Sequence, residues 1–418
     1  MKQGYKNMRC GLIGEHLGHS FSALIHSELA DYSYEICELP PEELGNFLKS
    51  GKLDAFNVTI PYKKDVIPYL DEISPEALSI GAVNTIVRDS EGKLHGYNTD
   101  YFGFSHMIDL SKIDVSGKKA IVFGRGGAAL TVCAVLRDRG VSELTIVGSA
   151  DNNPKNLAKH RDSEIIVNAT PVGMYPKNGV SPLSLSDFPS CDCVFDLIFN
   201  PARTALLIEA ENKGVPYVNG LPMLVAQAAK AFEFFTGDKY EEGCIERITS
   251  IISQKTRNVV LVGMPGCGKT TVGKLVARKL DKYFVDADVE FENMHGISPA
   301  ECIETMGEER FRELEHKTIC ELGKRSGTVI ATGGGAVTRE CNYDPLHQNG
   351  SIFFIERRLE KLARGGRPLS MSTSPEEMYA KRIDFYNRFA DVTVHSNEIP
   401  EDTANKIIDE FKKLCLGV

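Results

Sequence analysis

Short apolar runs alternate with segments of helical spacing along most of this chain. SALIHSELADY (22–32) has helical spacing, and apolar strand-like runs occur at 8–14, 55–60, 118–123, 144–148, 164–170 and 193–199. Strands that alternate with helices in this way predict parallel α/β sheets. Two further stretches, 82–88 and 93–99, flank the turn-forming residues Asp89–Gly92 and predict a β-hairpin at a sheet edge.

A break in this pattern predicts a domain boundary. The polar stretch from Ser253 to Arg257 interrupts the alternation just before a new apolar strand, NVVLVG (258–263). Within the first part, the strand at 118–123 opens a second strand-turn-helix unit, so we expect two lobes with a cleft between them. The 418 residues are enough for two to three compact units, since domains usually contain roughly 100–200 residues.

Composition narrows the class of protein. Hydrophobic residues make up 42% and charged residues 25% of the chain, which are ordinary values for a globular protein. No apolar run approaches the ~20 residues of a bilayer span, and the N-terminus lacks the pattern of a secretory signal, so we expect a cytoplasmic location. The eleven cysteines are scattered, which favours free thiols over a zinc site. A net charge of −9 disfavours nucleic acid as a partner, and small-molecule substrates are expected.

A phosphate-binding loop is the most specific motif. Residues 263–270, GMPGCGKT, match G-x-x-x-x-G-K-[ST], with an apolar strand before them and the helical segment TVGKLVARKL after them. In such a loop, backbone N–H groups surround phosphate oxygens, Lys269 reaches the terminal phosphates and Thr270 supplies a ligand to Mg²⁺. A chance glycine turn is the alternative, and the correctly placed strand and helix disfavour it.

Charged and glycine-rich positions downstream extend this candidate site. If residues 285–289 are extended, Asp286 and Asp288 leave the same face of a strand, where one can serve the metal and the other an acceptor hydroxyl. Three consecutive glycines, 333–335, follow an apolar strand and let a ligand lie against bare backbone. The candidate anion ligands are Arg312, Arg367 and Arg382. For each of these charged residues, an exposed surface position is the alternative interpretation.

From about Arg257 to its end, the sequence resembles shikimate kinase. GMPGCGKTT, FVDADVE, GEERFRELE, ATGGGAV, RPLS and KRIDFYNRFAD occur in that family's order. The resemblance implies a P-loop α/β domain of the nucleoside monophosphate kinase type with a parallel sheet. It further implies that this domain transfers a phosphoryl group from Mg²⁺-ATP to shikimate.

The same resemblance implies roles for individual residues. It implies catalytic roles for Lys269, Asp288 and Arg367, and it places Thr270 and Asp286 at Mg²⁺. The implied shikimate ligands are Asp288, Arg312, Gly333, Gly334, Gly335 and Arg382. The implied ATP ligands are Gly263, Gly266, Cys267, Gly268, Lys269, Thr270, Thr271 and Arg364. Only two glycines, 365–366, separate Arg364 from Arg367, which makes a shorter lid than the family pattern.

A second nucleotide motif lies in the first part of the chain. Residues 124–129, GRGGAA, match G-x-G-x-x-[GA] between the strand at 118–123 and a helical segment. A dinucleotide pyrophosphate would rest on the start of that helix. The next strand ends at Gly148, and Ser-Ala-Asp follows at 149–151. These first positions hold neither a plain acid for NAD nor an arginine for a 2′-phosphate, so the choice between NAD and NADP stays open.

Two segments upstream carry candidate proton-transfer residues. NVTIPYKK places Asn57, Thr59 and Lys63 at the end of a strand, and GYNTD places Asn98 and Asp100 at the end of another. A lysine beside a carboxylate can pass a proton to or from an alcohol while hydride moves. An exposed lysine and a helix-capping aspartate are the alternative.

Residues from about Met8 to Ser250 resemble shikimate dehydrogenase. GEHLGHSFSALIH, NVTIPYK, GAVNT, GYNTD, GRGGAA, NATPVGM and GLPMLVAQA appear in that family's order. The resemblance implies NADPH-dependent reduction of 3-dehydroshikimate by a catalytic pair, Lys63 and Asp100. The implied substrate ligands are Ser20, Ser22, Thr59, Asn84 and Gln227. The implied NADP ligands are Gly124, Arg125, Gly126, Gly127, Ala128, Ala129 and Ser149.

Together the two resemblances predict the domain organisation of an α/β protein. An α/β substrate-binding lobe spans 8–104 and is completed by helices near 223–250. A Rossmann NADP-binding lobe spans 105–222. A linker at 251–257 leads to the P-loop kinase domain at 258–418.

The first part departs from the dehydrogenase pattern at several positions. His16 and Ala23 stand where prolines are expected, and Phe199 replaces a tyrosine whose hydroxyl helps to bind the substrate. The Asn-Arg-Thr that usually grips the 2′-phosphate is missing after the second strand of the Rossmann lobe. We hypothesise that Arg125 or Lys155 compensates for it.

The two resemblances predict consecutive steps of the shikimate pathway, which supplies aromatic amino acid precursors. The first domain makes shikimate and the second phosphorylates its 3-hydroxyl. One alternative keeps both folds but assigns quinate and NAD to the first site. Another is a non-catalytic regulator derived from these domains, which the presence of the candidate catalytic residues disfavours. The sequence predicts no oligomeric state.

Overall fold

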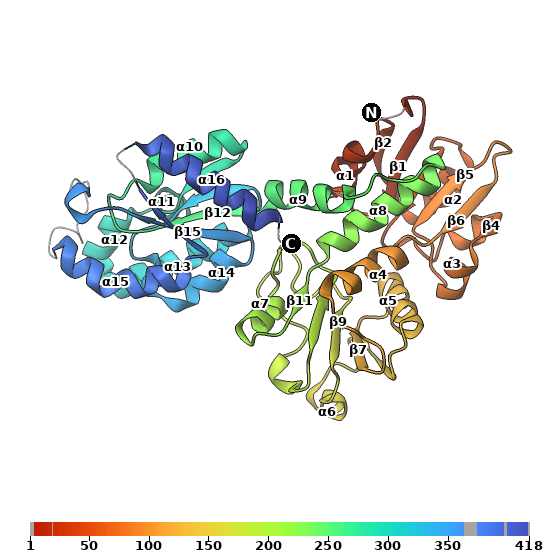
Figure 1. The fold of residues 1–418 in the computed structure, drawn as a ribbon, viewed down its shortest axis with the longest axis horizontal. Coiled ribbons are helices and arrows are strands. Elements are labelled where there is room, and N and C mark those ends of the chain that lie inside the picture. Colours follow the sequence, from red (N-terminus) through yellow and green to blue (C-terminus); the bar gives the residue numbers. More distant parts are fainter. Residues whose placement is uncertain (1–3, 19, 363–373, 397–398, 417–418) are drawn as a thin grey trace. The chain divides into compact units, whose positions relative to one another are not determined.

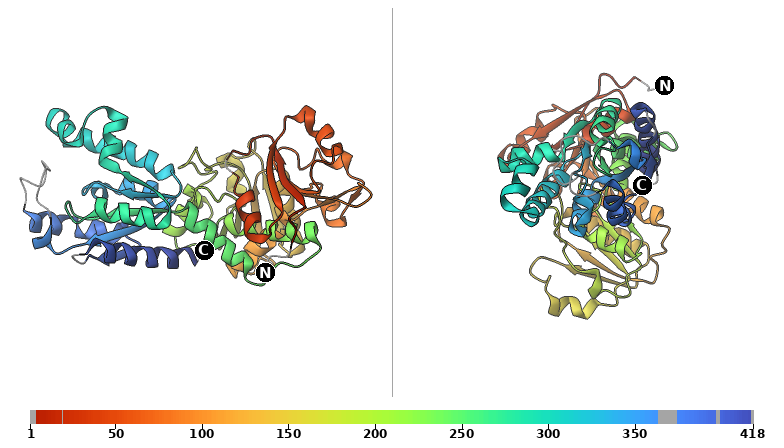
Figure 2. Two further views of the ribbon diagram at one scale, coloured as in Figure 1. Left: turned by 90° about the horizontal axis from the view of Figure 1, so that it is seen from above. Right: turned by 90° about the vertical axis from the view of Figure 1, so that its left-hand side faces the viewer.

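The computed structural model describes residues 4–18, 20–362, 374–396 and 399–416. Arg364 and Arg367 lie outside these residues. The chain divides into two compact units, which Figures 1 and 2 show in colours that follow the sequence. The first unit comprises Met1–Val172, Ser181–Phe199 and Glu209–Thr249, and the second comprises Gly173–Val180, Asn200–Ile208 and Ser250–Val418.

The N-terminal lobe is built on a mixed sheet. Its described strands are, in sheet order, β2 (Ser33–Glu38), β1 (Arg9–Gly14), β3 (Ala55–Val58), β5 (Thr85–Arg88), β6 (Leu94–Tyr97) and β4 (Glu72–Ile73). β1 pairs in parallel with β2 and β3, whereas β5 pairs antiparallel with β3 and β6. The predicted hairpin is present, but the short strand β4 lies beyond β6 at the edge. The sheet is therefore mixed, because the short turn of the predicted hairpin joins antiparallel strands while β1, β2 and β3 pair in parallel.

The described part of this lobe also contains α-helices. They are α1 (Ser22–Leu29), α2 (Leu44–Lys49), α3 (Pro75–Ile80), α4 (Asp100–Ser111) and α8 (Leu221–Thr236). α4 and α8 pack closely because a glycine lies at their contact: a Cβ atom on Gly103 would be 2.7 Å from Met223 O. This close packing fixes the start of α4, where Asp100 lies.

The second lobe carries a parallel Rossmann-type sheet. Its described strands are, in sheet order, β11 (Tyr217–Val218), β10 (Cys193–Asp196), β9 (Ile165–Asn168), β7 (Lys119–Phe123) and β8 (Glu143–Val147). Its helices are α5 (Gly127–Asp138), α6 (Pro154–Leu157) and α7 (Ala205–Asn212). The strand order reverses between β7 and β9, and ligands of open α/β sheets bind outside the carboxyl ends of the strands at such a point.

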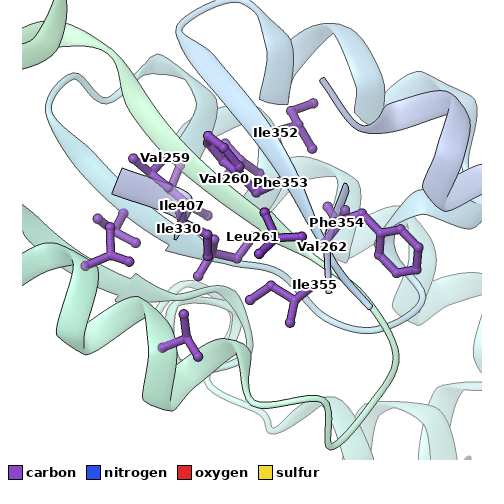
Figure 3. Packing of buried hydrophobic residues seen from close by; sticks show 14 of the residues in the cluster. Val259, Val260, Leu261, Val262, Ile330, Ile352, Phe353, Phe354, Ile355 and Ile407 are labelled. Atoms are coloured by element: carbon purple, nitrogen blue, oxygen red, sulfur yellow. The ribbon is translucent and has the colours of Figure 1, made fainter. Parts of the chain in front are cut away.

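The second unit is organised around another parallel sheet. In the described part of the chain its strands are, in sheet order, β13 (Tyr283–Asp286), β14 (Thr328–Ala331), β12 (Asn258–Val262), β15 (Gly350–Glu356) and β16 (Val392–His395). Strands β12 and β15 are apolar on both faces, and Figure 3 shows Val259, Leu261, Ile352 and Phe354 packed in the resulting core. A strand buried on both faces is expected where helices cover both sides of a parallel sheet.

The helices of this unit lie on both sides of that sheet. They are α10 (Lys269–Leu280), α11 (Ala287–His295), α12 (Pro299–Met306), α13 (Glu308–Lys324), α14 (Tyr343–His347), α15 (Pro375–Phe389) and α16 (Pro400–Leu416). In Figure 1, α10 and α16 cover one face, and α13 and α14 lie on the other. The predicted linker region, 251–257, is occupied mainly by the end of helix α9 (Cys244–Thr256). Among the described residues, no helix has the length and apolarity needed to cross a membrane.

Candidate active sites

A buried ion pair forms the centre of the first site. Lys63 follows β3, and its Nζ atom donates a hydrogen bond of 2.6 Å to Asp100 Oδ2 at the start of α4. The two side chains are 15% and 9% exposed. A Cβ atom on Gly127 would lie 3.3 Å from Lys63 Cδ, so the lysine runs along the start of α5. Lys63 therefore connects a carboxylate of the substrate-binding lobe with the glycine turn of the Rossmann lobe.

Polar side chains beside this pair form a connected chain. Thr99 immediately precedes Asp100, and its Oγ1 donates to Gln227 Oε1 on α8 at 3.3 Å. Asn84 Oδ1 accepts the Thr99 backbone N–H at 2.7 Å, and its Nδ2 donates to Thr99 Oγ1 at 3.1 Å. Thr59 follows β3, where its N–H donates to Ile13 O at 2.9 Å. The structure thus brings Asn84 and Gln227 together around Thr99, a residue that the sequence analysis missed although it lies inside the GYNTD motif.

The two candidate serines flank an aromatic residue at the start of α1. Ser22 N–H donates to Ser20 Oγ at 3.2 Å, and Ser22 is 8% exposed. Phe21, between them, packs edge to face against Phe199 with 5.7 Å between the ring centroids. Phe199 follows β10, so this contact joins the loop that carries the serines to the Rossmann lobe.

Asn57 and Asn98, from the same quoted motifs, are buried and form hydrogen bonds within the lobe. Asn57 Oδ1 accepts from Tyr34 Oη at 2.8 Å and from His26 Nε2 at 3.1 Å. Asn98 Nδ2 donates to Ala82 O at 2.9 Å. Burial lowers the pKa of His26 to about 3, so its ring is neutral and stacks on Tyr34 at 4.0 Å. Asn57 and Asn98 therefore use their side chains in hydrogen bonds to other groups of the protein, which holds the strand ends that carry the site.

The glycine turn after β7 has a backbone suited to a phosphate group. Gly124 has φ +123°, and a Cβ atom there would lie 2.8 Å from Ala169 O at the end of β9. A Cβ atom on Gly126 would meet none of the described heavy atoms within 4 Å, so this part of the turn is open. Ala128 lies in the first turn of α5, and Ala129 is buried beneath it. The start of α5, with its unpaired N–H groups, lies where the turn opens.

Arg125 leaves this turn toward the end of β8. A Cβ atom on Gly148 would lie 2.9 Å from Arg125 Nε and 3.1 Å from its Cζ, so the arginine lies across Gly148. Its Nη2 atom forms an ion pair with Asp151 Oδ2 in the loop that follows β8. Ser149 lies between Gly148 and Asp151 and is exposed, and Lys155 is an exposed residue of α6.

The centre of the second site is the loop between β12 and α10. Gly263, Gly266 and Gly268 all have positive φ angles, of +147°, +80° and +105°. Lys269 Nζ donates to Gly263 O at 2.8 Å and to Met264 O at 3.2 Å, so the lysine curls over the loop. Cys267 points into the core, where it is 1% exposed, whereas Thr271 is exposed on α10.

The expected extended geometry of the two aspartates is wrong. Strand β13 ends at Asp286, and Asp288 lies in the first turn of α11. The Asp286 side chain caps this helix by accepting the Asp288 N–H at 3.1 Å, which is the usual role of an aspartate at an N-cap. Asp286 Oδ2 also accepts from Thr270 Oγ1 at 2.8 Å. Both aspartates nevertheless line one cavity of about 340 Å³ with Lys269 and Thr270.

Each of the three consecutive glycines faces a different part of this cavity wall. A Cβ atom on Gly333 would lie 2.9 Å from Glu315 Oε1, and one on Gly334 would lie 2.7 Å from the Pro265 ring. A Cβ atom on Gly335 would overlap the Arg312 guanidinium. The absence of side chains therefore lets this segment pack directly against the phosphate loop and the buried arginine.

Arginine side chains line the same cavity. Arg312 is 7% exposed and forms a 2.7 Å ion pair with Glu315, which is 8% exposed. Arg382 Nη1 donates to Gly334 O at 3.1 Å, and Tyr386 Oη donates to the same oxygen at 2.5 Å. The structure thus brings Arg312 and Arg382 to the cavity that holds Asp288, whereas Arg364 and Arg367 lie outside the described residues.

The sequence analysis missed two features of this site, namely Glu315 and a second cavity. Burial raises the pKa of Glu315, and the facing Arg312 opposes that shift. Its spacing of three residues from Arg312 on a helix was a usable signal. A second cavity of about 470 Å³ is lined by Arg357, Arg358, His395 and Ser396 at the ends of β15 and β16. Arg357 connects it to the loop, since a Cβ atom on Gly268 would lie 3.9 Å from Arg357 Nη1.

Both parts of the chain match described protein families. Residues 12–86 match the family model "Shikimate dehydrogenase substrate binding domain", and residues 265–412 match "Shikimate kinase". NADP(+)-dependent shikimate dehydrogenase from Caldanaerobacter subterraneus subsp. tengcongensis is 39% identical over 260 residues, which cover 56% of this chain and 92% of that protein.

Solved structures give the same result for the first part. A chorismate mutase/shikimate 5-dehydrogenase fusion protein from Clostridium acetobutylicum is 35% identical, with a TM-score of 0.55 over 59% of this chain and 98% of the other. Shikimate 5-dehydrogenase from Thermus thermophilus, solved with NADP(H) and shikimate, is 33% identical, with a TM-score of 0.53 over 58% and 98%.

Proposed function

We propose that this chain catalyses two consecutive reactions on one cyclic hydroxy acid. Its N-terminal part belongs to the shikimate dehydrogenase family, and a shikimate kinase domain follows it. The first reaction is reduction of 3-dehydroshikimate to shikimate with NADPH. The second is phosphorylation of the shikimate 3-hydroxyl with Mg²⁺-ATP. The observation that carries the proposal is the Lys63–Asp100 pair beside the cofactor turn, matched in the second unit by Lys269, Thr270 and Asp286 at one cavity.

The glycine turn of the Rossmann lobe fits a dinucleotide. The positive φ of Gly124 and the open backbone at Gly126 leave room for a pyrophosphate at the start of α5. The residues that would hold it are Gly124, Gly126 and Gly127, with Arg125 and Ser149 toward the ribose. When bound, the nicotinamide supplies the hydride.

Lys63 is placed to supply the proton. As the ketone carbon of the substrate gains hydride, its oxygen gains a proton from Lys63 Nζ, which Asp100 holds at 2.6 Å. Ser20 and Ser22 would bind the substrate carboxylate, and Thr59, Asn84 and Gln227 would bind its hydroxyls. Because Asn84 and Gln227 both contact Thr99, these groups are fixed relative to Asp100 before the substrate binds.

The loop after β12 fits ATP and magnesium. Thr270 and Asp286 present two oxygen donors that are 2.8 Å apart, and Mg²⁺ prefers oxygen ligands. Lys269 now donates to two loop carbonyls, and phosphate oxygens would replace these acceptors. Mg²⁺ neutralises phosphate charge when bound.

Asp288 would accept the proton of the attacking hydroxyl. Arg312 and Arg382 would hold the substrate carboxylate through charge-assisted hydrogen bonds, each worth about 1.5–3 kcal/mol. The protein would thus act by positioning and by charge neutralisation, as is usual in phosphoryl transfer. Arg367, which lies outside the described residues, is proposed to meet the transferring group.

A coupled assay tests the whole proposal. The purified chain would be incubated with 3-dehydroshikimate, NADPH and Mg²⁺-ATP, and shikimate 3-phosphate would be measured by mass spectrometry. The reaction would be repeated with NADH, and in reverse with quinate and each oxidised cofactor. Formation of shikimate 3-phosphate supports both halves, whereas preferential oxidation of quinate with NAD would contradict the first half. No turnover by either domain would favour the non-catalytic regulator.

A further inference from the structure

The pair formed by Arg125 and Asp151 lies where a Rossmann lobe distinguishes NAD from NADP. In this fold the residue that reads the 2′ position of the adenosine ribose usually comes from the end of the second strand. Here that strand is β8, and it ends beside Gly148, which has no side chain. The Arg125 side chain lies across Gly148 and reaches Asp151 in the following loop. The arginine thus comes from the phosphate turn itself and occupies the place of the missing side chain.

We propose that Arg125 and Asp151 together set the cofactor preference of the dehydrogenase, Arg125 by binding the 2′-phosphate of NADP and Asp151 by opposing it. This inference rests on the proposed dehydrogenase function. A guanidinium group binds phosphate oxygens through two parallel hydrogen bonds, which a 2′-hydroxyl does not offer. The Arg125 side chain is 62% exposed, so an incoming phosphate reaches it without moving the core.

Asp151 acts in the opposite direction for two reasons. Its carboxylate pairs with the guanidinium that the phosphate must bind, so the two anions compete for Arg125. It also carries a negative charge next to the phosphate, which raises the free energy of bound NADP but not that of bound NAD. A carboxylate can additionally accept a hydrogen bond from the 2′-hydroxyl of NAD. The chain is therefore expected to prefer NADP by a smaller margin than Arg125 alone would give.

Gly148 determines where the Arg125 side chain lies. A Cβ atom there would lie 2.9 Å from Arg125 Nε and 3.1 Å from Cδ, closer than these atoms normally approach. A Gly148→Ala substitution therefore displaces the arginine without altering its charge. This variant separates the position of Arg125 from the mere presence of a positive charge.

Binding measurements test the proposal without turnover. Adenosine 2′,5′-bisphosphate and AMP would be titrated into the full chain by calorimetry. Arg125→Ala and Gly148→Ala are expected to weaken the bisphosphate at least tenfold and AMP less than twofold. Asp151→Asn is expected to tighten the bisphosphate several-fold, and this gain should vanish when it is combined with Arg125→Ala. Lys159→Ala, an exposed lysine beyond α6, serves as the matched charge control.

Kinetics separate this inference from the proposed function. In Arg125→Ala the ratio of the KM values for NADPH and NADH should rise at least tenfold. An unchanged ratio in an active Arg125→Ala enzyme overturns the inference, as does a loss of preference in Lys155→Ala instead. Absence of dehydrogenase turnover in the unaltered chain contradicts the proposed function, and the bisphosphate titrations then still decide the role of Arg125.

Discussion

The side chain of Lys63 runs along Gly127, so closely that a methyl group on Gly127 would be 3.3 Å from the lysine Cδ. The lysine comes from the substrate-binding lobe, and Gly127 opens helix α5 of the Rossmann lobe. Its ammonium group continues to Asp100, 2.6 Å away. The proposed proton donor therefore contacts both lobes.

This geometry predicts the effect of removing the ammonium group. Lys63→Ala is expected to lower kcat for 3-dehydroshikimate reduction by roughly 10²–10⁴-fold, because a positioned acid usually contributes that much. The shikimate kinase rate of the same preparation should not change. NADPH oxidation and ADP release would be followed in parallel. Lys64→Ala, which removes the neighbouring exposed lysine, should leave both rates intact, and equal losses in the two variants would refute the assignment.

The reciprocal substitution concerns the phosphate loop. Lys269 is 8% exposed and donates to two loop carbonyls, so it is fixed beside the expected position of the phosphates. Lys269→Ala is expected to reduce phosphorylation by at least 10³-fold, since charge neutralisation is a main part of this chemistry. Dehydrogenase turnover is the internal control, and Lys274→Ala on the exposed side of α10 is the matched variant. Loss of both activities in folded Lys269→Ala would contradict independent sites.

Gly335 and Gly334 predict different kinetic effects although they are adjacent. Gly335 has φ −105°, which any residue adopts, so an alanine there strains no backbone but displaces the Arg312 guanidinium. The KM for shikimate should rise roughly 10- to 100-fold, the value of one charge-assisted hydrogen bond, while the KM for ATP stays constant. Gly334→Ala instead places a methyl group 2.7 Å from the Pro265 ring and should raise the KM for ATP as well. Identical kinetic profiles would count against this assignment of the two contacts.

Much of the arrangement could be predicted because the informative motifs are local. The glycine turns at Gly124 and Gly263 each lie between a strand and a helix, and these elements are present in the structure. Alternating apolar segments also predicted the hairpin of β5 and β6. In such motifs the residues that determine the backbone and those that would bind the ligand are the same.

Other features depend on contacts between distant segments. An aspartate at position 286 is compatible with an extended strand and also with the N-cap of a helix. The sequence did not show that helix α11 begins at the next residue, Ala287. Arg125 lies over Gly148 and thereby connects two loops. No local sequence pattern indicates that these two loops lie close together. In the sequence Glu315 looks like an ordinary helix-surface residue, but in the structure only 6% of the whole residue is exposed, and it lies against Gly333 and Arg312. These contacts follow from packing, which hydrophobic periodicity does not specify.

His26 predicts how the dehydrogenase unit responds to acid. It packs between Tyr32, Tyr34 and Asn57, and burial lowers its pKa to about 3 from an unfolded value of 6.5. Between these values the unfolded chain binds a proton that the folded chain does not. The free energy of unfolding therefore falls as the pH falls below about 6.5, by up to about 1.4 kcal/mol per pH unit from this residue.

The pH response can be measured by urea unfolding of the dehydrogenase unit, followed by the loss of its activity at pH 7.5 and 5.5. His26→Gln should be less stable at pH 7.5, because it loses the ring stack on Tyr34, but its stability should fall by about 1.4 kcal/mol less on acidification. His16→Gln, at an exposed position, should keep the full acid response. Titrating groups common to all three proteins cancel in this comparison. An equal response in His26→Gln and the unaltered chain would show that the folded protein admits a proton at His26 above pH 5.5.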